Sequence, residues 1–191
     1  MYQKYQTEAL VLRSYERGEA DRVFALFTKE FGLVLARCSA VRRESSRMRY
    51  AVQNYAHANI SLVRGSTGWR AAGAAAISHI ESANICAAKA FARAANLVER
   101  LVRGEERNEY LFASLAEAHA ALMREPQESH GAIELLCVAR VLYALGYVSA
   151  EALGTALFTH TAYALPDLVE AETARVKLLS SVNKAISETH L

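Results

Sequence analysis

The 191-residue sequence has few of the residues that interrupt regular structure. It contains 2 prolines, 9 glycines and a single tryptophan, against 52% apolar and 22% charged residues. Disordered chains are poor in apolar residues and rich in proline and charge. The composition of this sequence therefore excludes a disordered chain and favours an ordered, globular one. The length suits one ordinary domain or two small domains that share an interface.

Cysteine is also scarce. Cys38, Cys86 and Cys137 lie about 50 residues apart, with no close pair to chelate a metal, and their odd number suits a reducing compartment. The six histidines form no HxH or HxxxH pair, which argues against a zinc or iron site. We therefore expect three small buried thiols, no metal and no other cofactor.

Long apolar runs and catalytic motifs are missing too. No stretch approaches 18 uncharged apolar residues, and the N-terminal segment carries charges where a signal peptide has its apolar core. There is no GxxxxGKS/T or GxGxxG motif to hold a nucleotide, and no nucleophile-elbow pattern. We expect a soluble, cytoplasmic protein that is not an enzyme.

The first 80 residues have the pattern of short β-strands, in which β-branched and aromatic runs are closed by glycine or by polar clusters. Several runs alternate between two faces, as a curved, half-buried sheet requires. Five strands in about 75 residues are enough for a small closed barrel. The expected strands are Ala9–Ser14, Arg22–Thr28, Leu33–Ser39, Asn54–Val63 and Trp69–His79.

Beyond residue 80 the apolar residues recur every three or four positions, which indicates amphipathic helices. Residues 147–171 are less regular, with a short helical piece at Glu151–Leu157 and an irregular stretch through Pro166. The expected fold class is thus α+β, with a barrel at residues 1–80 and a helical domain at residues 81–191. The main helices are expected at Asn84–Arg103, Glu109–Arg124, Gly131–Leu145 and Glu172–Glu188.

The net charge of +2 hides an asymmetry between the two parts. Residues 1–70 hold 12 Lys and Arg against 6 Asp and Glu, whereas residues 71–191 hold 10 against 14. The basic part therefore suits an anionic partner. In the helical part the apolar stripes suit core packing, and this net acidic part could also dock a peptide of another protein.

The most basic segment is residues 37–50, which holds five arginines and one acid in 14 residues. Arginine presents a planar set of donors that binds phosphate oxygens and stacks on bases, and Ser39, Ser45 and Ser46 could add neutral donors. A solvated connector is the plainer interpretation. Because the basic residues are all arginine, we favour a nucleic-acid contact through Arg37, Arg42, Arg43, Arg47 and Arg49.

Three further residues extend this prediction onto later strands. Arg64 and Arg70 flank the aromatic Trp69, and a positive groove with aromatic rings is the usual way for a small barrel to bind a single strand. Trp69 and Tyr50 are candidate stacking residues, although a place in the core is the somewhat favoured interpretation for each. The predicted DNA-binding residues are Arg37, Arg42, Arg43, Arg47, Arg49, Arg64, Trp69 and Arg70.

Two other functions fit the same residues. An RNA-binding barrel is possible, since phosphate contacts and stacking do not read the 2′-hydroxyl. A protein adaptor is also possible, with the helical part carrying the function and the barrel as scaffold.

Several short sequence words stand out in the N-terminal part. They are TEALVLR at 7–13, GEADR at 18–22, FTKEFG at 27–32, VRR at 41–43, SRMR at 46–49 and ISLVRG at 60–65. Together these words resemble the RecO family of recombination mediators. The resemblance extends more loosely into the helices and is strongest over about 70 residues.

This resemblance implies an OB-fold followed by a helical domain, without ATP hydrolysis. It implies single- and double-stranded DNA, the single-stranded DNA-binding protein and RecR as partners, and indirectly RecA. The implied function is to bind and anneal single-stranded DNA and to help load recombinase onto gaps. In the GEADR word, Gly18 suits a hairpin turn, and we expect Glu19, Asp21 and Arg22 to form a structural ion pair.

The chain departs from the family at one place. Many relatives insert a four-cysteine zinc module after the helix that ends here near Leu145, but this chain continues with Val148-Ser149-Ala150-Glu151 and contains no CxxC. The resemblance therefore implies no zinc site in this chain.

Overall fold

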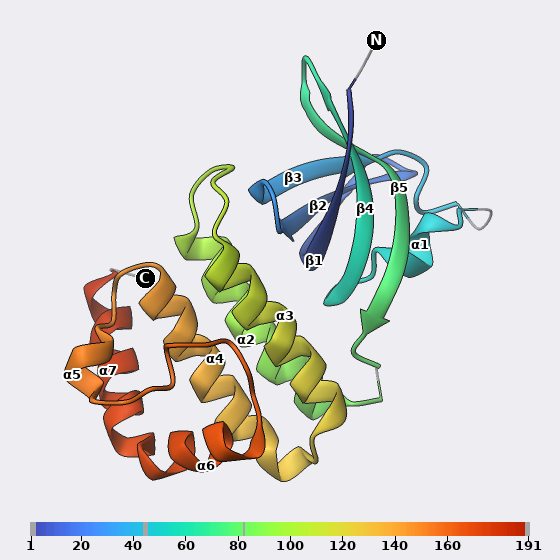
Figure 1. Ribbon diagram of the computed structural model, residues 1–191. Helices are drawn as coiled ribbons and strands as arrows, with labels where there is room; N and C mark the ends of the chain where they lie inside the picture. The colour runs from blue at the N-terminus through green and yellow to red at the C-terminus, as the bar shows by residue number, and fades with distance from the viewer. Residues whose placement is uncertain (1–2, 44–45, 82, 190–191) are drawn as a thin grey trace. The chain divides into compact units, whose positions relative to one another are not determined.

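The computed structural model describes residues 3–43, 46–81 and 83–189 (Figure 1). The chain divides into two compact units, and the division after Glu81 lies one residue from the expected domain boundary. The segment Val102–Glu109 was expected within the helical domain, but it groups with the N-terminal unit. The barrel unit therefore includes a loop that comes from between two helices.

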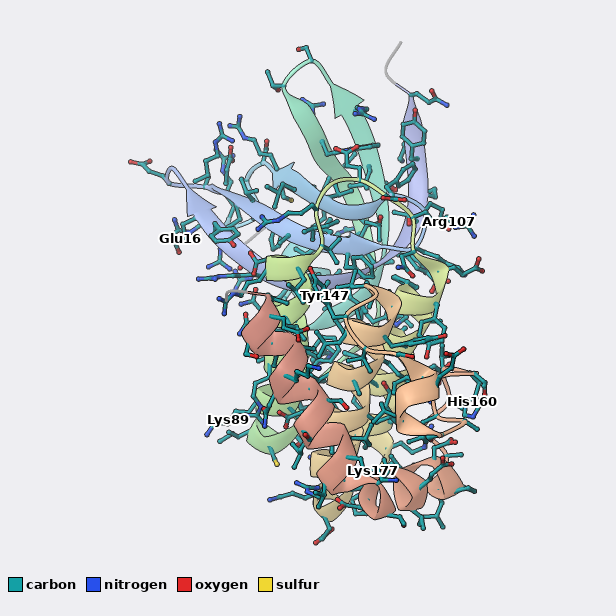
Figure 2. The ribbon with its side chains drawn as sticks, turned by 90° about the vertical axis from the view of Figure 1, so that its left-hand side faces the viewer. Glu16, Lys89, Arg107, Tyr147, His160 and Lys177 are labelled. Carbon is teal, nitrogen blue, oxygen red and sulfur yellow. The ribbon has the colours of Figure 1, made fainter. Side chains whose placement is uncertain are left out.

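The N-terminal unit is a five-stranded closed barrel in the order β1-β2-β3-β5-β4. The order confirms the expected α+β class and the OB-fold. β1 ends at a hairpin near Glu16 (Figure 2), and β3 joins β5 through only two parallel residue pairs. The strands are β1 (Lys4–Arg17), β2 (Asp21–Thr28), β3 (Gly32–Cys38), β4 (Ala56–Gly65) and β5 (Gly68–His79).

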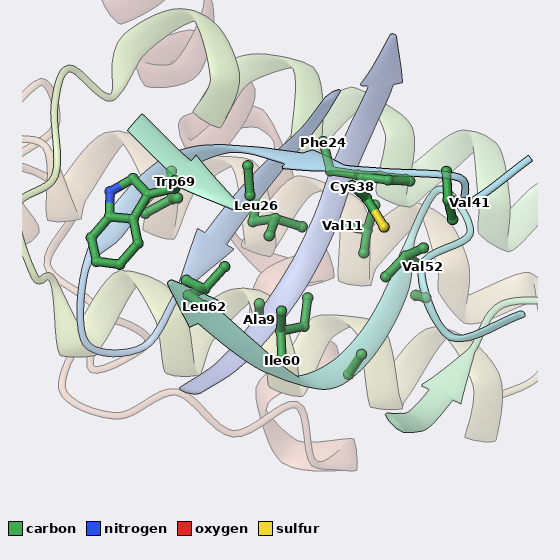
Figure 3. Close-up of a cluster of buried hydrophobic side chains, with 14 residues drawn as sticks. Ala9, Val11, Phe24, Leu26, Cys38, Val41, Val52, Ile60, Leu62 and Trp69 are labelled. Atoms are coloured by element: carbon green, nitrogen blue, oxygen red, sulfur yellow. The ribbon is translucent and has the colours of Figure 1, made fainter. Parts of the chain in front are cut away.

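Alternating apolar residues from the strands fill the barrel interior. Phe24, Leu26 and Ile60 are at most 1% exposed and belong to one core cluster. A short helix, α1 (Met48–Ala51), follows β3, and the residues on either side of it, Val41 and Val52, pack into the same cluster. Trp69 lies at the opposite end of the cluster from these two valines (Figure 3).

The second unit is helical, and its central helix is α4, which packs against α2, α6 and α7. Burial of α4 on nearly all sides explains its apolar sequence. The segments are α2 (Ile85–Leu101), α3 (Glu109–Arg124), the 3₁₀ turn η1 (Gln127–Ser129), α4 (His130–Ala144), α5 (Ala150–Leu153), α6 (Leu165–Thr173) and α7 (Arg175–Glu188). No helix among the described residues is both long and apolar enough to cross a membrane.

The expectation for residues 147–171 was wrong at α6. The sequence predicted an irregular stretch through Pro166, but a helix begins at Leu165, with proline in its first turn. Proline is favoured there for two reasons. A backbone N–H in the first turn has no carbonyl partner within the helix, so its absence costs little, and the φ of proline already suits a helix. The Asp167 carboxylate also accepts a hydrogen bond from the Ala164 N–H at 2.9 Å and caps the helix.

Candidate nucleic-acid interface

Three arginines from separate segments line one pocket of about 320 Å³ in the barrel unit, which we call the mouth pocket. Arg22 comes from β2, Arg42 from the segment after β3, and Arg49 from α1. The remaining lining residues are Phe24, Val41, Val52 and Gln53. The pocket therefore combines cationic walls with an apolar floor that belongs to the barrel core.

The β1–β2 hairpin holds two of these arginines. The Glu16 carboxylate lies 3.4 Å from the Arg22 guanidinium and 3.4 Å from that of Arg42. Arg42 also donates to the Gly18 carbonyl at 3.3 Å, and its backbone N–H donates to the Ala20 carbonyl at 3.1 Å. Gly18 has φ of 66°, as expected for a residue that turns the hairpin. One carboxylate is thus shared by two arginines, and the pocket keeps a net positive charge.

Asp21 anchors the start of the basic segment. Its carboxylate accepts hydrogen bonds from the Ala40 N–H at 2.8 Å and from the Arg37 Nε at 3.0 Å. These two contacts, the Ala40 N–H first, hold the pKa of the Asp21 carboxyl below its ordinary value. The expectation of an ion pair among Glu19, Asp21 and Arg22 was therefore wrong: Asp21 pairs with Arg37, and Arg22 pairs with Glu16.

The other predicted basic residues lie in two places. Arg43 and Arg47 are exposed in the segment that leads to α1, and among the described residues neither forms an ion pair. Arg37 and Arg70 are register partners where β3 meets β5. Ser45, a predicted neutral donor, lies outside the described residues.

Trp69 belongs to the core, which corrects its assignment as a stacking residue. It is 5% exposed, and its ring contacts Tyr5 and Phe31 at centroid distances of 5.6 Å and 5.2 Å. Its register partner on β3, Ala36, also faces the core. A base could stack on Trp69 only if the barrel opened.

Arg64 covers this buried ring instead of the mouth pocket. Its guanidinium lies 5.2 Å from the Trp69 ring centroid and 3.4 Å from the Glu105 carboxylate. We therefore leave Arg64 out of the mouth-pocket interface.

Tyr50, the other candidate stacking residue, is 63% exposed, and the Arg49 guanidinium lies 5.2 Å from its ring centroid. Tyr50 therefore stays available to a base.

Arg22 is the pocket residue that the sequence interpretation missed. It was assigned only to an ion pair, although strand alternation places it on the same face as Phe24, at the start of β2. An arginine at the first inward position of a barrel strand was the available signal. Gln53 gave no such signal, because its place depends on how the chain returns from α1.

The cysteines offer no reactive thiol in the pocket. Cys38 and Cys137 are buried, as expected, and burial raises the pKa of their thiols to about 11 and about 12. Cys86 is only half-buried, which corrects the expectation of three buried thiols. The described residues contain no group of three or more His, Cys, Asp or Glu side chains placed to hold a metal ion.

The helical unit has a groove of about 330 Å³ between α2, α4 and α7, which we call the helical groove. Leu97, Leu135, Val138, Val182 and Ile186 make most of its apolar lining. Arg93, which is paired with Glu134, and Arg175, which is paired with Glu172, also line it, and Arg100 lies in an adjoining hollow beside Arg93 and Leu97. The groove is thus apolar with a mainly basic edge.

Comparison with known proteins finds matches in the N-terminal part of the chain, which forms the barrel. The family described as Recombination protein O N terminal matches residues 1–71. The DNA repair protein RecO of Desulfitobacterium hafniense is 40% identical over 63 residues, or 33% of this chain and 23% of that protein. The RecO protein of Heliobacterium modesticaldum is 43% identical over 61 residues (32% and 22%), and that of a Nocardioides species is 39% identical over 61 residues (32% and 25%).

The matched segment thus spans about a quarter of the length of each of these relatives. The match to the family model, over residues 1–71, runs from β1 into β5 and includes every residue of the mouth pocket. The resemblance read from the sequence words is confirmed over this part of the chain, because residues 1–71 match the RecO N-terminal family model.

Proposed function

We propose that this chain is a non-enzymatic mediator of DNA repair and recombination that binds single-stranded DNA at the mouth pocket. The observation that carries the proposal is the convergence of Arg22, Arg42 and Arg49 on one pocket of a RecO-type barrel. Guanidinium groups bind phosphate oxygens in a planar, two-donor geometry, and the apolar floor can receive a sugar or a base.

The mechanism follows from charge. Two complementary strands repel each other through their phosphates, and arginines that neutralise one backbone lower the barrier to pairing. Arg43 and Arg47, exposed beside the pocket, extend the basic surface along the strand. The same binding would hold gapped DNA while recombinase is loaded onto it.

Protein partners form the second part of the proposal. The expected partners are the single-stranded DNA-binding protein and RecR, with RecA engaged indirectly and double-stranded DNA next to the gap. The helical groove supports a docking role, because its apolar lining and basic edge complement a peptide that carries apolar and acidic side chains. Charge on the edge would steer the encounter, and the apolar lining would supply affinity.

The salt dependence of binding tests the mouth pocket. Each arginine that binds a phosphate of a single strand adds about 0.7 to the steepness of log K against log salt, so Arg42→Ala/Arg49→Ala should reduce the steepness by about 1.4. Fluorescence anisotropy of a labelled oligonucleotide across salt concentrations gives this slope. Lys177→Ala/Lys184→Ala removes equal charge from exposed positions on α7 and should leave the slope unchanged. An unchanged slope in the arginine variant removes the mouth pocket from the interface.

Two other functions have distinct outcomes. If RNA and DNA oligonucleotides of one sequence compete equally, or RNA binds more tightly, the chain is an RNA-binding barrel. The helical groove is the observation that favours a protein adaptor. Normal DNA binding by the mouth-pocket variant, together with loss of binding to purified single-stranded DNA-binding protein in Leu97→Glu, would support the adaptor instead.

A further inference from the structure

The outer face of the barrel carries a row of side chains that runs across four strands. Tyr15 on β1 is the register partner of Val23 on β2, and Val23 is the partner of Arg37 on β3. Arg37 is in turn the partner of Arg70 on β5. Neighbouring strands lie about 4.8 Å apart, so these four residues form one short line across the sheet.

Strand alternation places this row outside the barrel. Phe24, Ala36 and Trp69 each follow or precede a row residue and belong to the core cluster. Since successive side chains point to opposite faces, Val23, Arg37 and Arg70 point outward.

A register shift between Val11 and Arg13 in β1 sets the face of the residues that follow it. Beyond the shift, Ser14 opposes Phe24 of the core, so Arg13 and Tyr15 face outward with the row. Without this shift, Tyr15 would lie on the inner face.

Two large apolar side chains beside this row are exposed. Tyr15 is 40% exposed and Leu35 is 60% exposed. The Arg13 guanidinium lies 5.1 Å from the Tyr15 ring centroid, and Arg13 and Leu35 share Ala25 as register partner. Each of the two exposed apolar side chains therefore has an arginine near it on the same face.

The charge of this face is mainly positive. Arg13 and Arg17 of β1, Arg37 of β3 and Arg70 of β5 face outward. Among the described residues of these strands, two acids share this face: Asp21, which pairs with Arg37, and Glu8 near the other end of β1, which lies 3.8 Å from Lys29. The outer-face strip is defined as Arg13, Tyr15, Arg17, Leu35, Arg37 and Arg70.

An occupant of the outer-face strip must be anionic at regular intervals and carry flat apolar groups between its charges. A single-stranded nucleic acid has both properties, because its unpaired bases can stack on a tyrosine ring while its phosphates meet arginines. A duplex hides its base faces and does not fit Tyr15.

We propose that the outer-face strip is a second contact surface for single-stranded nucleic acid, distinct from the mouth pocket. Tyr15 and Leu35 contact bases, and Arg13, Arg17 and Arg70 contact phosphates. This inference rests on the proposed function, and it adds that binding depends on the bases as well as on the backbone. The barrel thereby engages a strand at two surfaces, one that grips phosphates and one that stacks bases.

The test compares a normal oligonucleotide with an abasic one of equal length and charge. The wild-type chain should bind the base-bearing strand at least about tenfold more tightly, the order expected from one stacked base. Tyr15→Ala should remove most of this preference, whereas Tyr15→Phe should keep it because the ring remains. Tyr147→Ala is the matched control, since Tyr147 is exposed to nearly the same extent, 42%. Circular dichroism of each variant confirms that it is folded.

The outcomes separate this inference from the proposed function. Equal affinity for both oligonucleotides in the wild type, or a Tyr15→Ala variant that keeps the full preference, overturns the outer-face strip and leaves the mouth pocket standing. Failure of the wild type to bind either strand overturns both proposals. If Tyr15→Ala does not fold, Leu35→Ser at the more exposed position makes the same comparison and should reduce the preference.

Discussion

At the scale of single residues, Asp21 holds the basic segment to the barrel. Its carboxylate joins the hairpin that ends at β2 to Ala40 and Arg37 at the end of β3. Ala40 itself has φ of 56°, a conformation that non-glycine residues rarely adopt. The carboxylate thus fixes an unusual backbone just before the arginines that line the mouth pocket.

Asp21→Asn should lower the free energy of unfolding at neutral pH and make that free energy less dependent on pH in the acid range. The folded-state pKa of Asp21 lies below its ordinary value of 3.8, so its stabilising contribution is complete above that value. It is lost as pH falls below 3.8 through the folded-state pKa, because the carboxyl then protonates. Urea unfolding followed by Trp69 fluorescence between pH 3 and pH 7 measures the difference between the two proteins.

The difference should shrink at the acid end of this range. Glu19→Gln, an exposed acid in the same hairpin, is the control and should change stability little at any pH. A constant difference between Asp21→Asn and wild type across the range would show that the carboxylate charge is not what stabilises this corner.

Residue identities predicted part of the site. The arginine-rich segment was visible as composition, and Arg42 and Arg49 do line the mouth pocket. Burial was not visible, because an aromatic residue beside arginines gives the same sequence pattern whether its ring faces inward or outward. For that reason Trp69 was assigned to the interface, although it packs with Tyr5 and Phe31.

At the scale of elements, Gly32 makes a close approach possible. It turns the chain between β2 and β3 with φ of 61°, and a Cβ atom there would lie 2.2 Å from the Glu106 carbonyl oxygen. The segment Val102–Glu109 therefore packs against this turn only because the residue has no side chain.

Gly32→Ala should destabilise the barrel by at least about 1–2 kcal/mol. The left-handed backbone alone costs this much for a residue with a Cβ, and the overlap with a backbone carbonyl adds to it. Gly65→Ala is the control, because its nearest neighbour would lie 3.7 Å away and its φ is ordinary. Urea unfolding followed by Trp69 fluorescence reports on the barrel, and equal stability of both variants would contradict the close approach.

In the helical unit, α4 holds an irregular segment through Arg140. This residue is fully buried and donates to the Leu157 carbonyl at 2.9 Å and the Ala162 carbonyl at 2.8 Å. Its guanidinium also lies 4.6 Å from the Tyr163 ring centroid. The segment between α5 and α6 therefore keeps its path through side-chain contacts to α4.

Arg140→Met should destabilise the helical unit by about 1–3 kcal/mol, because the buried Leu157 carbonyl loses its donor. Hydrogen exchange of residues 154–164 should also speed up. Arg93→Met removes an arginine that is 58% exposed and paired with Glu134, and it should cost less than about 1 kcal/mol. Unchanged exchange in Arg140→Met would mean that the segment is held by other contacts.

Element type was well predicted from periodicity, and element ends were not. α3 begins and ends at the expected residues, since Pro126 and a clear apolar repeat define it. α6 was missed because proline was interpreted as a breaker, whereas position in the first turn decides its effect. β1 extends beyond the predicted strand at both ends because pairing with β2 and β4 orders polar residues too.

At the scale of the whole molecule, the chain combines a barrel unit that matches the RecO N-terminal family model over residues 1–71 with a helical unit. The sequence predicted a five-stranded barrel followed by helices, because the change from period two to period 3.6 marks the boundary. It did not predict that Val102–Glu109 joins the barrel, since that depends on the turn at Gly32 rather than on any local pattern.

The central claim is that the barrel binds single-stranded DNA at the mouth pocket. Hydrogen exchange with mass spectrometry, with and without a single-stranded oligonucleotide, tests it most directly. The account predicts slower exchange in peptides that cover residues 18–24 and 39–53, and in the outer strands if the outer-face strip is also engaged. Unchanged exchange in residues 39–53, with protection confined to the helical unit, would contradict the account.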